Sequence, residues 1–247
     1  KDLQKRLVSS RDDLRTIVDL LKTLSLPDFE RDTEYISLTD HGREYAYIRG
    51  SLKSSDGWEI PVPEYRTRIH EWVPDHSTGK HAKSSRDSYM VGALARFKNN
   101  YEALHPAAKA VAEELGLKRT SCNPFMNSVA QVVECVHCTE DAVELIEEIL
   151  DKGLKEEDQH VEVRAGTGAG AADVPRGTLF HEYTVDGDGT ITGANLVIPT
   201  GQNFANIEDD MRALVPQILD RSQDEIRLML EMLVRGAPLI GATAAYG

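Results

Sequence analysis

The first 27 residues alternate apolar and charged positions with the period of an amphipathic helix. Leucine or isoleucine recurs every three, four or seven residues, at Leu3, Leu7, Leu14, Ile17, Leu21 and Leu24. This spacing places the apolar side chains on one helix face, and Pro27 ends the pattern. We therefore predict a first helix that ends before Pro27. No capping residue precedes it, so we expect the chain to begin inside a larger domain.

Residues 35–62 follow a different pattern. Short runs rich in aromatic and β-branched residues, such as Tyr45-Ala46-Tyr47-Ile48, are separated by turn residues, with Asp56-Gly57 as the clearest turn signal. Such runs are typical of short antiparallel strands. We predict a small antiparallel hairpin or sheet here.

Two long helical stretches come next, over residues 86–115 and 124–151. Gly116 and Gly153 follow them, as expected of helix stops, because glycine readily adopts the left-handed conformation found there. The second stretch carries an almost continuous apolar stripe, made of Val129, Val132, Val133, Val136, Val143, Ile146, Ile149 and Leu150.

The last third of the sequence predicts a hairpin and two helices. Residues 178–185 and 190–198 alternate apolar and polar positions around Asp186-Gly187-Asp188-Gly189, a strong hairpin signal. Helical patterns follow over residues 206–219 and 222–235. We find no internal repeat and no long low-complexity linker. The fold class predicted is α+β, a single, mainly helical domain over residues 1–247 with small antiparallel hairpins.

Composition narrows the possible functions. The chain has 247 residues, 40% of them hydrophobic, which is enough to bury a core. Asp and Glu outnumber Lys and Arg by 41 to 28, giving a net charge of −13. This balance disfavours nucleic acids and anionic membrane surfaces as partners. No apolar run is long enough to span a membrane, and the amino terminus does not resemble a signal peptide. A cytoplasmic protein without membrane insertion is expected.

Cysteine offers little candidate chemistry. The chain has three cysteines, too few for a disulfide framework. Cys135 and Cys138 form a CxxC around His137, but no second cysteine pair completes a four-ligand site. Because the CxxC falls in the middle of a predicted helix, we interpret these cysteines as small buried thiols rather than a metal or redox site.

Histidine and glycine patterns are equally weak. The histidines are not spaced as HxxxH or HxH ligand sets, and most are expected on the surface or in packing; they include His70, His76, His81, His105 and His181. Gly166, Gly168 and Gly170 superficially suggest a phosphate-binding loop. No strand and helix with the required GxGxxG pattern surround them, so we reject that interpretation.

One motif is far more specific. It runs from Asp173-Val174-Pro175-Arg176-Gly177 through the predicted hairpin to Pro199-Thr200-Gly201-Gln202-Asn203. It resembles a signature of nickel-iron hydrogenase large subunits, especially the soluble multimeric cofactor-coupled type. Residues 69–77, 88–96 and 207–235 resemble the same family. The resemblance covers nearly the whole chain and corresponds to the carboxy-terminal half of the large subunit.

The resemblance implies a role for four residues. In the family, the arginine of the Pro-Arg-Gly turn and the Ser or Thr after a later proline face the cyanide ligands of iron. The resemblance thus makes Arg176 catalytic, and makes Pro175, Arg176, Pro199 and Thr200 cofactor-binding. A guanidinium suits this role because it is permanently charged and presents several planar donors. An isolated turn of this kind would instead be interpreted as carrying a solvent-facing arginine.

The same resemblance implies a nickel-iron centre with CN and CO ligands, shared with partner chains, and iron-sulfur clusters only in partner subunits. The family holds nickel with four cysteines, two from RxCGxC and two from DPCxxC. Neither motif is present. Aligning Pro238 with the proline of the second motif puts Leu239 and Ala242 at its cysteine positions. No metal ligand is therefore predicted in this chain.

Three hypotheses follow. In the first, the chain is part of the large, catalytic component of a hydrogenase and is active only together with chains that carry the missing cysteines and with an iron-sulfur small subunit. In the second, it is a catalytically inactive, hydrogenase-like scaffold. In the third, it is an unrelated acidic module that binds another protein. An intact Arg176 and Thr200 favour the first, and the degenerate end of the sequence favours the second.

Overall fold

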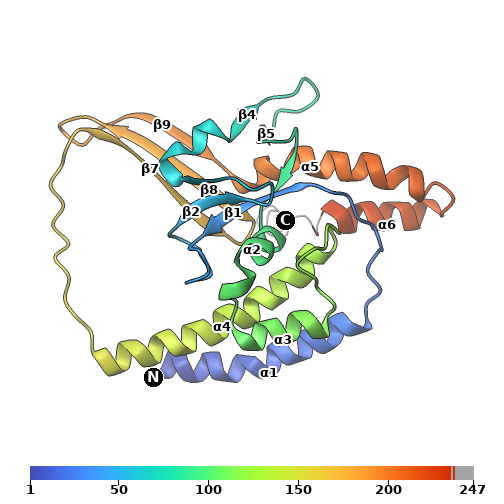
Figure 1. The fold of residues 1–247 in the computed structure, drawn as a ribbon, viewed down its shortest axis with the longest axis horizontal. Helices are drawn as coiled ribbons and strands as arrows, with labels where there is room; N and C mark the ends of the chain where they lie inside the picture. Colours follow the sequence, from blue (N-terminus) through green and yellow to red (C-terminus); the bar gives the residue numbers. More distant parts are fainter. Residues whose placement is uncertain (235, 237–247) are drawn as a thin grey trace.

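Helices and three small sheets make up the structure, a computed structural model that describes residues 1–234 and 236 (Figure 1). The predictions for Arg235 and for the segment around Pro238 lie outside these residues. No helix in the described part of the chain is long and apolar enough to cross a membrane.

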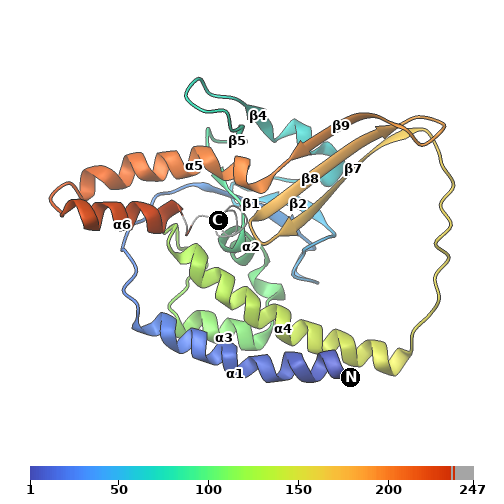
Figure 2. The same cartoon turned by 180° about the vertical axis from the view of Figure 1, so that it is seen from behind.

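A layer of helices lies on one side of the sheets. Helices α1 (Asp2–Thr23), α3 (Pro106–Glu114) and α4 (Met126–Lys152) run side by side, and both views show α2 (Ala93–Asn100) between this layer and the strands (Figures 1 and 2). Apolar side chains of α2, α3 and α4 form the largest buried cluster. The short 3-10 turn η2 (Tyr101–Ala103) connects α2 to α3.

The largest sheet has the order β3-β2-β1-β6. Its central strand β1 (Glu34–Thr39) is buried along its whole length. It pairs antiparallel with β2 (Ser51–Ser54) and parallel with β6 (Tyr89–Met90), and β2 pairs antiparallel with β3 (Glu59–Pro61). The 3-10 helix η1 (Val62–Thr67) follows β3.

Two further sheets complete the strands. Strands β4 (His70–Trp72) and β5 (His81–Lys83) form a two-stranded ribbon. Strands β7 (Gly166–Val174), β8 (Gly177–Val185) and β9 (Ile191–Val197) form an antiparallel meander. The chain then enters α5 (Pro199–Leu214), η3 (Val215–Gln217) and α6 (Gln223–Val234); α5 and α6 lie next to each other in both views (Figures 1 and 2).

Most predicted elements are confirmed. Helices α1, α4 and α6 and the hairpin of β8 and β9 occur where the sequence predicts them. The antiparallel strands β2 and β3 lie within the predicted region, and β1 begins one residue before it. Gly57 has a φ of +92° in the turn between β2 and β3. Gly116 and Gly153 follow their helices with φ of +69° and +76°, as expected of helix stops.

Four details differ from the prediction. Residues 45–48 form a loop instead of a strand, because Tyr45 packs against α4 and its hydroxyl donates a hydrogen bond to Glu134 at 2.9 Å. The predicted helix 86–115 is divided into β6, α2 and α3, with Pro106 opening α3. Strand β7 was not predicted, and α5 begins seven residues earlier than expected.

Candidate functional site

The segment with the predicted site residues is a two-residue turn. Val174 pairs with Gly177 across the β7–β8 hairpin, so Pro175 and Arg176 form its tip. Gly177 has a φ of +131°, and a Cβ at this position would lie 2.2 Å from Cγ2 of Val91. Glycine is therefore needed both for its backbone conformation and for the close approach of the segment after β6. The turn therefore packs directly against Val91.

We expect Gly177→Ala to destabilise the protein by about 2–3 kcal/mol, because the new methyl group combines an unfavourable φ with a clash. Gly168→Ala on β7 is the matched control, since a Cβ there meets nothing within 4 Å. Its effect should stay within about 0.5 kcal/mol. Urea unfolding of both variants measures the difference. Equal stability of the two variants would contradict the close approach at Val91.

The buried side chain of Arg96 binds the backbone of the turn. Its side chain is 1% exposed and forms a bidentate ion pair with Glu134 of α4, with Nε–Oε1 at 2.6 Å and Nη2–Oε2 at 2.7 Å. The same guanidinium donates to the carbonyl oxygens of Val174 at 2.8 Å and Pro175 at 3.2 Å. These are the two carbonyls that precede Arg176. A buried, fully bonded guanidinium therefore fixes the backbone that carries the candidate catalytic side chain.

Asp173 supports the turn from its other side. Its carboxylate accepts hydrogen bonds from the Leu38 backbone N–H and the Thr178 hydroxyl, both at 2.7 Å, and lies 3.7 Å from Nη1 of Arg96. Burial raises the pKa of Asp173 to about 6, although the Arg96 charge and both hydrogen bonds act in the opposite direction. The carboxylate thus joins β1, β7 and β8 immediately before the turn.

Thr200 is the second residue of α5. Pro199 is the first helical residue, and Ile198 at the N-cap provides no side-chain hydrogen bond. The first backbone N–H groups of the helix therefore receive no hydrogen bond from an N-cap side chain, and the positive end of the helix dipole there favours anions. Pro199 is buried and Thr200 is half-buried.

Two amides of α5 connect the helix to the hairpin. The Asn203 side chain accepts from the Val91 N–H at 2.9 Å and donates to the Arg176 carbonyl at 3.4 Å. The Gln202 side chain donates to the Thr178 carbonyl at 2.6 Å. Because Asn203 is one helical turn after Thr200, the turn at Arg176 and the amino terminus of α5 lie at the same end of the meander. Arg176 itself is half-buried and Pro175 is exposed.

The supporting residues were not predicted as site residues. Arg96 falls within the segment 88–96 that resembles the hydrogenase motif, but its pairing with Glu134 depends on a contact between α2 and α4. Gln202 and Asn203 were part of the quoted motif after Thr200, without a role. Arg96 could have been identified because it is a charged residue at a helix position that the apolar pattern predicts to be buried.

The cysteines take no part in this site. Cys135 and Cys138 are exposed on α4, so the prediction of buried thiols is wrong. Desolvation raises the pKa of both thiols, which favours the protonated form over the thiolate that metals bind. The ring of His137 between them accepts from the His105 backbone N–H at 3.1 Å. Among the described residues, no cysteine belongs to a cluster of possible metal ligands.

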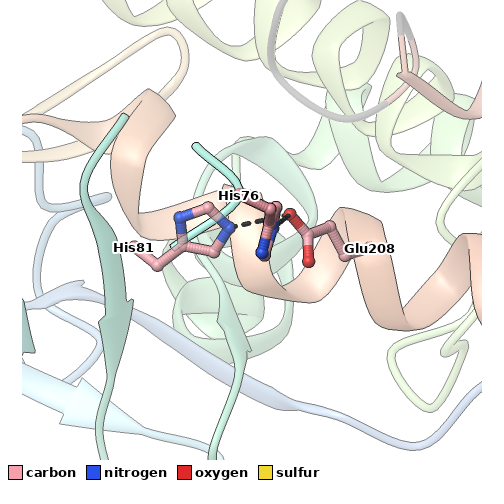
Figure 3. A group of neighbouring side chains, drawn as sticks. All are labelled: His76, His81 and Glu208. Carbon is pink, nitrogen blue, oxygen red and sulfur yellow. Dashed lines mark hydrogen bonds and ion pairs between the residues drawn. The ribbon is translucent and has the colours of Figure 1, made fainter. Parts of the chain in front are cut away.

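Two histidines lie close to a carboxylate from a distant segment of the chain. His76 and His81, which sequence spacing did not identify as ligands, converge with Glu208 of α5 (Figure 3). The loop between β4 and β5 brings the two imidazoles together, and the carboxylate comes from a segment more than 120 residues away. Spacing along the chain cannot reveal such a contact.

Comparison with known proteins identifies relatives along most of the chain. No model of a known protein family matches it. It is 31% identical over 208 residues to the alpha subunit of sulfhydrogenase 1 from Pyrococcus furiosus, a match that covers 84% of this chain and 48% of that protein. It is 32% identical over 192 residues to a subunit of the F420-non-reducing hydrogenase vhu from Methanococcus voltae, covering 72% of this chain and 44% of the relative. The chain thus spans about half the length of the curated relatives it matches.

A solved structure shares the fold. An NAD+-reducing nickel-iron hydrogenase in its H2-reduced state superposes with a TM-score of 0.80 and 23% identity, over 96% of this chain and 57% of that chain. This similarity confirms the predicted fold class, an α+β arrangement like that of a hydrogenase large subunit.

Proposed function

We propose that this chain, which is homologous to hydrogenase subunits, is part of the large catalytic subunit of a nickel-iron hydrogenase. Such an enzyme interconverts dihydrogen with protons and electrons. In this proposal the chain contributes the pocket that holds the diatomic ligands of the metal centre, and other chains contribute the cysteines that hold nickel.

One observation carries the proposal: the turn at Arg176 and the first turn of α5 meet at one end of the meander. The Asn203 side chain bonds the Arg176 carbonyl, and Arg96 bonds the two carbonyls before it. The proposal is that the Arg176 guanidinium, the Thr200 hydroxyl and the positive end of the helix dipole act together at this place. Together they suit a small anionic ligand, as cyanide on iron is.

The residues fit the outer contacts of a nickel-iron centre, although they provide no thiolate. When bound, the centre supplies the metal chemistry that splits or forms dihydrogen. In this chain, Arg176 would donate hydrogen bonds to anionic ligands, and the Thr200 hydroxyl would add another. Pro175 and Pro199 restrict the backbone on either side of the site. The buried pair of Arg96 and Glu134 is too far inside the fold to meet a ligand and instead positions the turn.

The partners follow from the same proposal. In the cytoplasm, we expect one or more chains with the missing cysteine motifs, together with an iron-sulfur small subunit. Large apolar side chains exposed on the helical layer support the expectation of a covered surface. They are Leu3 and Leu20 on α1, Leu24 directly after α1, and Leu145, Ile149 and Leu150 on α4. Both of the curated relatives named above are themselves subunits.

Two other functions remain as competing proposals. An inactive scaffold is favoured by the degenerate sequence after Pro238, where Leu239 and Ala242 stand at the cysteine positions of the second motif. A scaffold has no evident need for Arg176 and Thr200, which is why we place this function second. An acidic interaction module explains the net charge of −13 but none of the packing around Arg176.

Metal analysis of the protein, purified from its natural host with its bound partners, tests these functions. We expect nickel and iron in the assembled complex and no stoichiometric nickel on the 247-residue chain alone, because its three cysteines do not converge. Replacing Cys135 and Cys138 with serine should leave the nickel content unchanged. Mass spectrometry of the complex identifies the polypeptide that carries the cysteine motifs.

Each outcome separates the hypotheses. A nickel-free complex that includes an iron-sulfur partner would favour the scaffold, and a complex without any other hydrogenase component would favour the interaction module. One nickel per isolated chain, lost in the serine variants, would overturn the proposal that the ligands come from elsewhere.

A further inference from the structure

Three possible metal ligands, two histidines and a carboxylate of α5, converge in the structure. Nε2 of His76 and Nε2 of His81 lie 2.8 Å and 2.9 Å from the same oxygen, Oε1 of Glu208. All three ligand atoms are within 4.8 Å of one another. Figure 3 shows both imidazole rings next to the Glu208 carboxylate, with their hydrogen bonds to it as dashed lines. The histidines come from the β4–β5 loop and β5, and the carboxylate comes from the helix.

The hydrogen bonds of His81 leave one ring nitrogen without a compatible partner. Its side chain is 4% exposed, and its Nδ1 lies 3.2 Å from the Gly79 carbonyl oxygen while its Nε2 faces Glu208. Both oxygens only accept hydrogen bonds. A neutral imidazole has a single N–H, so in either tautomer one lone pair faces an oxygen. A second proton or a metal ion must therefore relieve this contact.

We propose that His76, His81 and Glu208 bind a zinc ion through Nε2, Nε2 and Oε1. Two neutral imidazoles and one carboxylate are a typical zinc ligand set. Donation of the Nδ1–H of His81 to the Gly79 carbonyl is the support that metal-bound histidines commonly have, and it fixes the tautomer that leaves Nε2 free to bind. Zinc then takes the place of the second proton at this nitrogen.

The site can accept the ion with small movements. Ligand atoms about 2.0–2.2 Å from a tetrahedral zinc are roughly 3.3 Å apart, so the present contacts must lengthen by about 0.4 Å. His76 can move, because its side chain is 59% exposed on the loop. Arg212 donates to Oε2 of Glu208 at 3.0 Å, which leaves Oε1 directed at the imidazoles. Three protein ligands leave a fourth position for water on the exposed side.

The proposed zinc would fasten the β4–β5 loop to α5. Backbone contact already brings the two segments together, since a Cβ at Gly201 would lie 2.9 Å from the Lys80 carbonyl oxygen. Glu208 follows Thr200 by eight residues, roughly 12 Å along the helix. The zinc ligand Glu208 is thus about two helical turns beyond Thr200, and the ion would brace the helix on which Thr200 lies.

Zinc binding to the purified protein, dialysed against a chelator and then titrated with Zn²⁺, tests the site. We expect one zinc per chain and a rise in melting temperature. His81→Gln and Glu208→Gln should each weaken binding at least ~100-fold, because loss of a ligand costs more than the 10- to 100-fold typical of losing a residue that only hydrogen-bonds to a ligand. With Co²⁺ in place of zinc, the visible absorption of a low-coordinate site should appear in the parent protein and be absent from both variants.

His41→Gln is the matched control, because His41 and Glu59 form an exposed histidine-carboxylate pair at 3.3 Å without a second imidazole. It should bind zinc as the parent does. Equal binding by the parent and the His81 variant would overturn the proposal, as would no zinc binding together with an NMR signature of a doubly protonated His81 ring. Circular dichroism confirms that each variant is folded. Nickel and iron are measured in the same samples, so loss of zinc alone distinguishes this site from the nickel-iron centre.

Discussion

Replacing Arg176 with lysine in the assembled complex is expected to lower hydrogen turnover by about 10²- to 10³-fold, the usual cost of losing a preorganised hydrogen-bond donor in an active site. Lysine keeps the positive charge but loses the planar set of donors that a guanidinium presents. The turn should persist, because its backbone is held by Arg96, Asn203 and Gly177 rather than by the Arg176 side chain. Nickel and iron contents should therefore change little.

The contrast between activity and metal content makes this test informative. Arg66→Lys is the matched control, because Arg66 pairs with Glu182 on the same hairpin but its side chain is 55% exposed. It should leave hydrogen turnover unchanged. In an inactive scaffold neither substitution would affect turnover. Unchanged turnover in an active complex with Arg176→Lys would remove the catalytic assignment of Arg176.

Sequence patterns predicted the elements that are regular along the chain. The apolar stripe of α4 and the Asp186-Gly187-Asp188-Gly189 turn both produce local periodicity that tertiary contacts do not override. The resemblance to hydrogenases predicted which turn and which helix start carry candidate chemistry. The structure brings those two segments together, through Asn203 and the Arg176 carbonyl. The roles assigned to Arg176 and Thr200 stay predictions.

The parts that sequence did not predict depend on long-range contacts. Strand β7 begins with glycines and alanines, residues of low β-propensity, and it forms because it pairs with the strongly patterned β8. Residues 45–48 have the composition of a strand, but they form a loop in which the Tyr45 hydroxyl donates a hydrogen bond to Glu134 of α4. His76, His81 and Glu208 have no informative spacing, because β5 and α5 are far apart in sequence. In each case a contact with a segment distant in sequence determines the local structure.

Arg96 is the residue whose loss should most destabilise the fold. Arg96→Met should cost about 3–5 kcal/mol, because Glu134 would remain as a buried carboxylate without its partner. Asp173 would lose a neighbouring positive charge as well, and two carbonyls before Arg176 would lose their donors. Urea unfolding of the purified protein measures the effect.

Two further variants distinguish the contribution of the buried Arg96–Glu134 pair to stability from a general effect of removing a charge. Arg11→Met removes an ion pair with Glu140 in which the arginine side chain is 44% exposed, and it should cost less than about 1 kcal/mol. Adding Glu134→Gln to Arg96→Met should recover part of the lost stability, because the double variant no longer buries an unpaired charge. If Arg96→Met were as mild as Arg11→Met, or if Glu134→Gln made it worse, Arg96 could not be the residue that fixes the turn before Arg176. A large loss with partial recovery would instead mean that the candidate pocket is built on this buried pair, and that its geometry depends on α2 and α4 as much as on the hairpin itself.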